Sequence, residues 1–305
     1  MLPFIQALIP IIVLIAIGYV LKRVTFLSDD IWAGIEKLTY YVMFPALLIY
    51  TLARQDIHGT PWPLMLFVTG VSLLGAAAVL IAWFHWRHST SATTFTSIFQ
   101  GGVRFNTYIA LSVSGAFYGE QGLALASRSA GFMIVVINLL CVSVFALYGD
   151  KQRPSAKTYL KQIAFNPLIV GCAIGWFLSL TGIGLPGISV DVFEIIGRAT
   201  LPIGLLAVGA ALKPRLIPGH LKSITVASVV QFLIKPALVF WLASLIGLPP
   251  LAFGVILIAF ISPTASSAYI LARQLGGDLE TMASIITLQT ILAFGVMPLW
   301  VVFLA

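Results

Sequence analysis

The chain has 305 residues, of which 60% are hydrophobic and only 9% are charged. A soluble domain carries about 25% charged residues, and it has too much surface for its volume to hide this much apolar side chain. The composition therefore excludes a soluble enzyme, a nucleic-acid-binding module and a disordered protein, and it predicts an integral membrane protein. The formal charge of +7 is then explained by basic residues that collect in cytoplasmic loops.

Apolar segments long enough to cross a bilayer as helices follow one another along the whole chain, since about 20 residues suffice. We predict ten spans, at residues 3–23, 35–54, 62–86, 93–118, 122–148, 164–184, 190–212, 221–247, 250–275 and 279–304. In the first apolar run the positive pair Lys22 and Arg23 follows the apolar residues, whereas a signal peptide carries its charge before them. We therefore expect this run to be retained as a span.

Basic residues give the spans an orientation. Most Lys and Arg residues at loops lie after odd-numbered spans, and Arg54 is the exception. Because cytoplasmic loops are enriched in such residues, both termini are predicted to lie outside, and the basic loop 149–163 in the cytoplasm. The expected location is the inner cell membrane, as a multi-pass protein. That loop is too short to hold a folded domain, so the function is expected within the membrane.

The two halves of the chain share an internal repeat. Adding 157 to a residue number takes Pro10 to Pro167, Gly18 to Gly175, Pro45 to Pro202 and Thr107 to Thr264. Residues 1–148 and 164–305 are therefore interpreted as two copies of a five-span unit, joined by the loop 149–163. Because five is odd, the second copy enters the membrane from the opposite side, an architecture of many secondary transporters.

The fourth and ninth spans are predicted to be broken near their centres. The fourth contains Gly101-Gly102-Val103-Arg104-Phe105-Asn106-Thr107, and the ninth contains Ser262-Pro263-Thr264-Ala265-Ser266. Proline and glycine loosen a helix, and freed backbone groups at membrane depth are tolerated beside a polar cavity. The N-terminal end of each half-helix would direct positive charge into that cavity, which suits an anion. The alternative is a pair of kinks that serve only close packing.

Charged residues inside the spans point to the same chemistry. Arg104 and Lys235 lie deep, and no Asp or Glu lies near the centre of a span. Unmatched buried cations predict an anionic substrate and argue against a cation exchanger. For Lys235 the alternative is that it bonds the carbonyls freed at the breaks. Asn138 and Gln289 either line the route or bond a neighbouring helix, whereas Arg128 and Arg198 are expected to extend to the outer interface.

Several motifs together resemble the auxin efflux carrier family of membrane transporters: Gly101–Asn106, Asn166–Leu168, Leu201–Gly204 and Ala272–Asp278. Bacterial members of that family are often called malonate or malate transporters, and plant relatives export auxin, a weak organic acid. The resemblance implies an all-α protein of ten transmembrane helices, similar in fold to the bile-acid and sodium/proton antiporter group. It also implies a scaffold part, a moving part, and a crossing of the fourth and ninth helices at Asn106 and Pro263.

These observations together predict a secondary transporter of small organic anions such as mono- or dicarboxylates. The candidate substrate-binding residues are Arg104, Asn106, Thr107, Gln231, Lys235, Ser262, Pro263, Thr264 and Ser266. Outward movement of an anion would be driven by a negative interior, at about 2.3 kcal/mol per charge per 100 mV. We expect no cofactor, no metal, no nucleic-acid partner and no catalytic residues, and a homodimer is left open.

Three alternatives remain at this point. The first is a sodium- or proton-coupled symporter or antiporter of the bile-acid-transporter type. The second is a receptor that uses the fold to bind a ligand without moving it. The third is a membrane enzyme, which would need an acid, a base and a nucleophile that converge, and the sequence offers no such cluster.

Overall fold

The computed structural model describes residues 2–54, 61–87, 90–149 and 165–301, and over these ranges the chain is helical and has no strand. The predicted basic loop 149–163 lies outside the described residues except for Gly149. An all-helical fold was predicted, and the described residues confirm it.

The first half begins with a single long helix and a second helix that changes its winding. The elements are α1 (Leu2–Arg23), α2 (Asp29–Leu38), the π-helical turn η1 (Thr39–Met43), α3 (Phe44–Ala53) and α4 (Trp62–Arg87). Pro45 stands in the first turn of α3, directly after the π-helical turn. A π-helical turn is a local widening of the helix that is frequent at functional sites, and it rotates the side chains that follow.

The rest of the first half contains the first predicted break. Three residues, 104–106, separate the end of α5 (Ala92–Val103) from the start of α6 (Thr107–Tyr148). Helix α6 itself holds one non-helical residue, Gly119, with φ +66° and ψ −156°. This backbone conformation is accessible to glycine and costly for other residues, so Gly119 separates the segments that we predicted as the fourth and fifth spans.

The second half has the elements α8 (Pro167–Leu180), α9 (Ser189–Ala210), the 3₁₀ segment η2 (Pro214–His220), α10 (Leu221–Val229), the π-helical turn η3 (Val230–Ile234), α11 (Lys235–Ile246), α12 (Pro250–Ile261), α13 (Ser267–Leu275) and α14 (Leu279–Val301). Pro236 follows η3 and has no N–H for the carbonyl of Phe232, four residues earlier. That carbonyl accepts instead from the indole N–H of Trp300, at 2.7 Å.

Capping residues explain several of these bounds. The hydroxyl of Ser91 accepts from the N–H of Thr94 at 3.1 Å and so caps α5. Asn166 caps α8, where Pro167 takes the first position because its missing N–H needs no partner there. Gly247 ends α11 in the left-handed conformation, with φ +65°.

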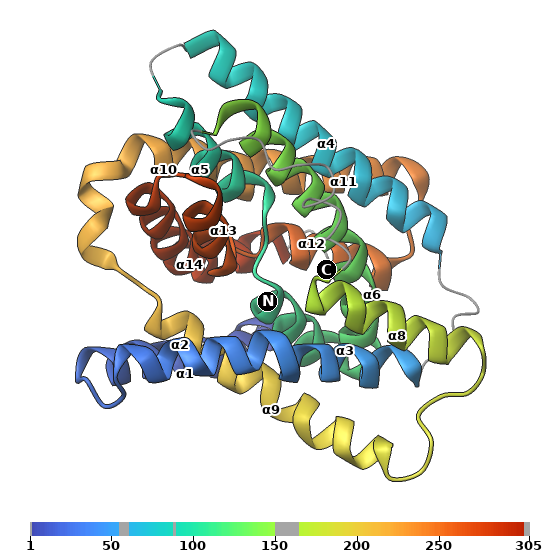
Figure 1. The fold of residues 1–305 in the computed structure, drawn as a ribbon. Coiled ribbons are helices and arrows are strands. Elements are labelled where there is room, and N and C mark those ends of the chain that lie inside the picture. The colour runs from blue at the N-terminus through green and yellow to red at the C-terminus, as the bar shows by residue number, and fades with distance from the viewer. Residues whose placement is uncertain (1, 55–60, 88–89, 150–164, 302–305) are drawn as a thin grey trace.

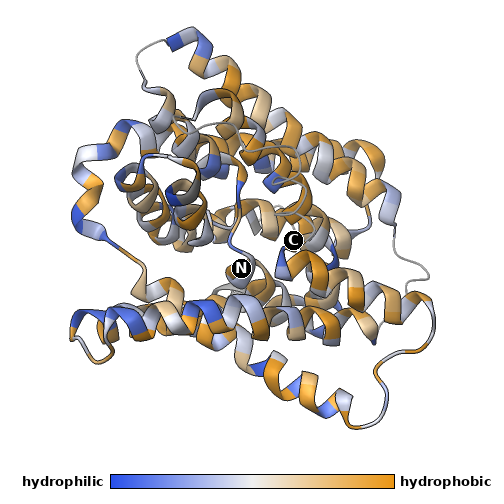
Figure 2. Cartoon of the chain, in the orientation of Figure 1, coloured by the Kyte–Doolittle hydropathy of each residue, from blue (hydrophilic) through white to orange (hydrophobic). Residues whose placement is uncertain are grey.

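Five helical runs of the described residues are long and apolar enough to cross a membrane: Trp62–Arg87, Ala92–Tyr148, Ser189–Ala210, Pro214–Ile246 and Leu279–Trp300. Shorter apolar helices cover Pro167–Leu180 and Pro250–Ile261. Figure 2 shows hydrophobic residues along most of the helices. The fold is therefore that of a membrane protein, and the count of ten spans stays a prediction.

The helices pack in two groups that α6 connects (Figure 1). In one group α1 packs on α9, and α3 packs on α8 and α9. In the other group α5 packs on α4, α10 and α14, and α11 packs on α4 and α12. Helix α6 contacts members of both groups, among them α1, α3 and α8 on one side and α5 and α12 on the other.

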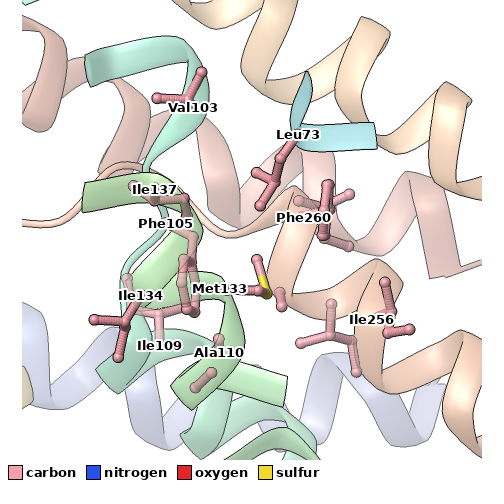
Figure 3. Packing of buried hydrophobic residues seen from close by; sticks show 14 of the residues in the cluster. Leu73, Val103, Phe105, Ile109, Ala110, Met133, Ile134, Ile137, Ile256 and Phe260 are labelled. Carbon is pink, nitrogen blue, oxygen red and sulfur yellow. The ribbon is translucent and has the colours of Figure 1, made fainter. Parts of the chain in front are cut away.

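Apolar packing surrounds the point where the groups meet. Phe105, Met133, Ile256 and Phe260 belong to one buried cluster, which draws on α6, α12 and the segment between α5 and α6 (Figure 3). Close-packed interiors change shape in discrete steps rather than continuously. This cluster therefore holds the two broken segments in a defined relation.

Candidate functional site

Both predicted breaks are present, and they touch each other. Residues 104–106 interrupt the helix between α5 and α6, and residues 262–266 interrupt it between α12 and α13. The backbone N–H of Asn106 donates to the carbonyl of Pro263 at 2.6 Å. The side chain of Asn106 is 1% exposed and accepts from the N–H of Ile109 at 3.2 Å, so it caps α6.

Gln289, on α14, bonds both breaks at once. Its side-chain oxygen accepts from the N–H of Thr264 at 3.0 Å, and its side-chain nitrogen donates to the carbonyl of Gly101 at 2.9 Å. The hydroxyl of Thr264 donates to the carbonyl of Gln100 at 3.3 Å. Of the two roles we left open for Gln289, the contacts are those of a residue that bonds its neighbours.

Lys235 and Gln231 lie on one face of the eighth predicted span, at the start of α11 and in η3, and both contact the breaks. The Lys235 ammonium donates to the carbonyls of Val103 and Arg104, each at 3.3 Å, and to the side-chain oxygen of Gln231 at 2.7 Å. The side-chain nitrogen of Gln231 donates to the carbonyl of Ser262. Both side chains are 0% exposed. The carbonyls that the breaks release are thus bonded by this pair, as in the alternative stated for Lys235.

A small cavity of about 40 Å³ opens beside the breaks. Its lining residues come from η1, α6, α8, α13 and both breaks: Tyr40, Arg104, Phe105, Thr107, Ile134, Ile137, Asn138, Leu168, Ala265 and Ser267. The Arg104 guanidinium donates to the side-chain oxygen of Asn138 at 3.3 Å. Thr107 and Ser267 are the first residues of α6 and α13, so two helix N-termini reach this cavity.

Two further contacts border the cavity. The hydroxyl of Tyr40 accepts from the side-chain nitrogen of Asn166 at 3.2 Å. The side chain of Glu36, on α2, forms a hydrogen bond with Ser266 in the second break. Glu36 was not among the predicted site residues, because a carboxylate beside Lys37 at the start of an apolar segment is typical of the membrane surface.

The structure thus divides the predicted site residues into three sets. Arg104 and Thr107 line the cavity. Asn106, Ser262, Pro263, Thr264 and Ser266 form the breaks, and Gln231 and Lys235 support the breaks from the side of α11. Gln100 was not predicted; it is 0% exposed and lies in the last turn of α5. An amide inside an apolar helix is the sequence signal that points to it.

A larger groove of about 470 Å³ lies elsewhere, between α1, α6 and α9. Most of its lining is apolar, with Glu120 and Arg198 as charged members. It shares no lining residue with the cavity at the breaks. We therefore restrict the candidate site to the small cavity.

Comparison with known proteins places the chain in a family. The model of the membrane transport protein family matches residues 3–301. An uncharacterized transporter of Methanothermobacter thermautotrophicus is 23% identical over 303 residues, which cover 98% of each chain. An uncharacterized transporter of Methanocaldococcus jannaschii is 24% identical over 301 residues, 95% of each chain.

A more limited match is to the ileal sodium/bile acid cotransporter of Oryctolagus cuniculus, with 31% identity over 102 residues, 32% of this chain and 29% of that one. The family match, by contrast, extends over nearly the whole chain. The predicted resemblance to the auxin efflux carriers is confirmed, and the chain belongs to the membrane transport protein family.

Proposed function

We propose that the chain is a secondary transporter of small organic anions, such as mono- or dicarboxylates, with the substrate held at the two breaks. One observation carries the proposal: the cavity is lined by Arg104 and by the first residues of α6 and α13, and none of its lining residues is Asp or Glu. The family is one of membrane transporters, which is not a class of enzymes.

A carboxylate matches each of these groups. Helix N-termini carry partial positive charge and unpaired N–H groups, which bind anions. An arginine side chain binds a carboxylate through two parallel N–H donors. In this conformation Arg104 donates to the neutral side chain of Asn138, and a bound carboxylate would accept hydrogen bonds from some of the same guanidinium N–H groups.

The size of the cavity supports alternating access. Ligand pockets usually measure at least about 300 Å³, whereas this cavity measures about 40 Å³. Entry of a dicarboxylate therefore requires the group of α4, α5, α10, α11, α12 and α14 to move against the group of α1, α3, α8 and α9. In our proposal these two groups are the moving part and the scaffold.

The packing also supports the inverted repeat of ten spans. A Cβ added to Gly18 of α1 would overlap the backbone of Leu206 in α9. A Cβ added to Gly175 of α8 would lie 3.3 Å from the Cα of Ile49 in α3. The offset of 157 that takes Gly18 to Gly175 also takes Ile49 to Leu206, so the two halves repeat one helix contact. In this arrangement both termini lie outside and the basic loop is cytoplasmic.

The test is flux of labelled malonate, malate and other small carboxylates through proteoliposomes, with and without an imposed membrane potential. We expect saturable flux that is driven outward by a negative interior. Arg104→Gln should reduce the flux about 10-fold or more, since a hydrogen bond to a charged group contributes about 1.5–3 kcal/mol. Arg54→Gln, at an exposed residue that ends α3, is the matched control and should keep the wild-type rate.

The proposal fails if the wild-type protein moves no carboxylate, or if Arg104→Gln moves it at the wild-type rate. Saturable binding of a carboxylate without flux would favour a receptor.

A second candidate, proton-coupled uptake, is favoured by Glu36. Its side chain forms a hydrogen bond with Ser266, so a change in its protonation reaches the second break directly. An inward proton gradient should then raise uptake by the wild-type protein and leave Glu36→Gln unaffected. If the flux of both proteins follows the membrane potential alone, this second candidate is excluded.

A further inference from the structure

The surroundings of the Lys235 ammonium are those of a cation-binding site. Its hydrogen-bond acceptors are all oxygen atoms: the carbonyls of Val103 and Arg104 at 3.3 Å and the side-chain oxygen of Gln231 at 2.7 Å. The ammonium also lies 5.4 Å from the centre of the Phe260 ring. Among the described residues, no carboxylate takes part in these contacts.

The oxygen atoms are provided by helix ends. Val103 is the last residue of α5, and Arg104 is its C-cap. Ser262 is the C-cap of α12, and its carbonyl holds Gln231 in place through a hydrogen bond. Helix C-termini carry partial negative charge, and the unwound carbonyls of broken membrane helices are the groups that coordinate Na⁺ in secondary transporters.

The ammonium is covalently attached and therefore cannot leave with the substrate. We propose that Lys235 fills a monovalent-cation site formed by the ends of α5 and α12, so that the protein needs no alkali cation to stabilise its two breaks. Removal of the amine uncovers a site for a small monovalent cation. The consequence for transport, independence from Na⁺, rests on the proposed function, whereas the binding site itself does not.

The test is thermal unfolding of the purified full-length protein in LiCl, NaCl, KCl or methylammonium chloride, with N-methylglucamine chloride as the reference salt. Lys235→Ala removes the ammonium and leaves room for an ion. Its melting temperature should rise by several degrees, in a saturable way, with at least one of the small cations, because binding to the folded state stabilises it. The wild-type protein should not respond.

Two variants separate the cation site from other salt effects. Lys235→Met also removes the ammonium but fills the space with an apolar side chain, so it should be destabilised and show no cation response. Lys222→Ala removes an exposed lysine of α10 and should behave like the wild-type protein.

A folded Lys235→Ala protein that responds to none of the four cations would overturn the proposal. The same holds if Lys235→Ala yields no folded protein in any of these salts, because the cation should replace the amine. In proteoliposomes, wild-type flux should be equal in Na⁺, K⁺ and N-methylglucamine media, and a requirement for Na⁺ would also contradict the proposal. If no carboxylate moves at all, only the proposed function fails, and the unfolding experiment still decides the question of the cation site.

Discussion

Gln289 offers a test of how the two breaks are stabilised. Gln289→Met keeps the length of the side chain and removes both of its hydrogen-bonding groups. The N–H of Thr264 and the carbonyl of Gly101 then lose their partners in a buried region, and α5 ends too early for the carbonyl to find a helical donor. Each stranded group costs about 1–3 kcal/mol, so the folded state should lose about 2–6 kcal/mol.

Measurements on other membrane proteins set a lower bound for this loss. Interhelical hydrogen bonds there contribute about 0.6 kcal/mol on average, because the unfolded chain in the membrane also finds partners. Two such bonds give about 1 kcal/mol. We therefore expect a loss of at least about 1 kcal/mol, and a lower carboxylate flux, because Gln289 bonds both breaks.

The assay is reversible unfolding in mixed micelles, with the free energy of unfolding compared between variants. The control is Thr290→Val on the same helix: Thr290 is also buried, and its hydroxyl donates only to the carbonyl of Ile286 within α14. That variant should stay close to the wild type in stability, since a threonine hydroxyl that bonds the carbonyl four residues back does not stabilise a helix, and the carbonyl keeps its helical position. If Gln289→Met is no less stable than Thr290→Val, the argument from stranded backbone groups is wrong.

Three further predictions concern the packing and the turns. Gly18→Ala should lower the free energy of unfolding by about 1–3 kcal/mol or more, because its Cβ meets backbone, whereas Gly295→Ala, where a Cβ meets nothing within 4 Å, should be neutral or slightly stabilising. Gly119→Ala should lower the free energy of unfolding by about 1–3 kcal/mol through the φ of +66° alone, since a Cβ there also meets nothing within 4 Å. If Gly119→Ala and Gly295→Ala change the free energy of unfolding equally, this explanation is wrong. Burial raises the pKa of the Asp278 carboxyl, but hydrogen bonds from Thr281 and Thr94 outweigh burial and hold that pKa below its ordinary value of 3.8. The ionised carboxylate therefore stabilises the folded protein fully above about pH 4, and this stabilisation is lost as the pH falls through the folded-state pKa. The melting temperature of the wild type should therefore fall more steeply below pH 4 than that of Asp278→Asn, and parallel curves would contradict the assignment.

Much of the fold could be predicted from the sequence because its signals are local. Apolar length indicated the helices, and the proline and the glycines marked the breaks between α5 and α6 and between α12 and α13. The five long apolar runs are fewer than the ten predicted spans, partly because one run contains two predicted spans. The run Ala92–Tyr148 counts as one span by length, although residues 104–106 interrupt its helix and Gly119 turns the chain within it.

The site was less predictable, because its contacts join residues far apart in the chain. Lys235 bonds carbonyls of residues 103 and 104, and Gln289 bonds that of Gly101; no spacing in the sequence signals such pairings. Their positions in the sequence therefore left two roles open for Lys235 and two for Gln289. Glu36 could not be predicted for a related reason, because its partner Ser266 lies in the other half of the chain.

The small cavity at the breaks also has an electrical consequence. Three of its lining residues, Phe105, Ile134 and Ile137, are apolar, and moving an ion out of water past apolar side chains costs free energy. In our proposal this conformation therefore opposes a leak of ions, and the voltage that would drive an anion outward is not dissipated through the carrier while it is closed.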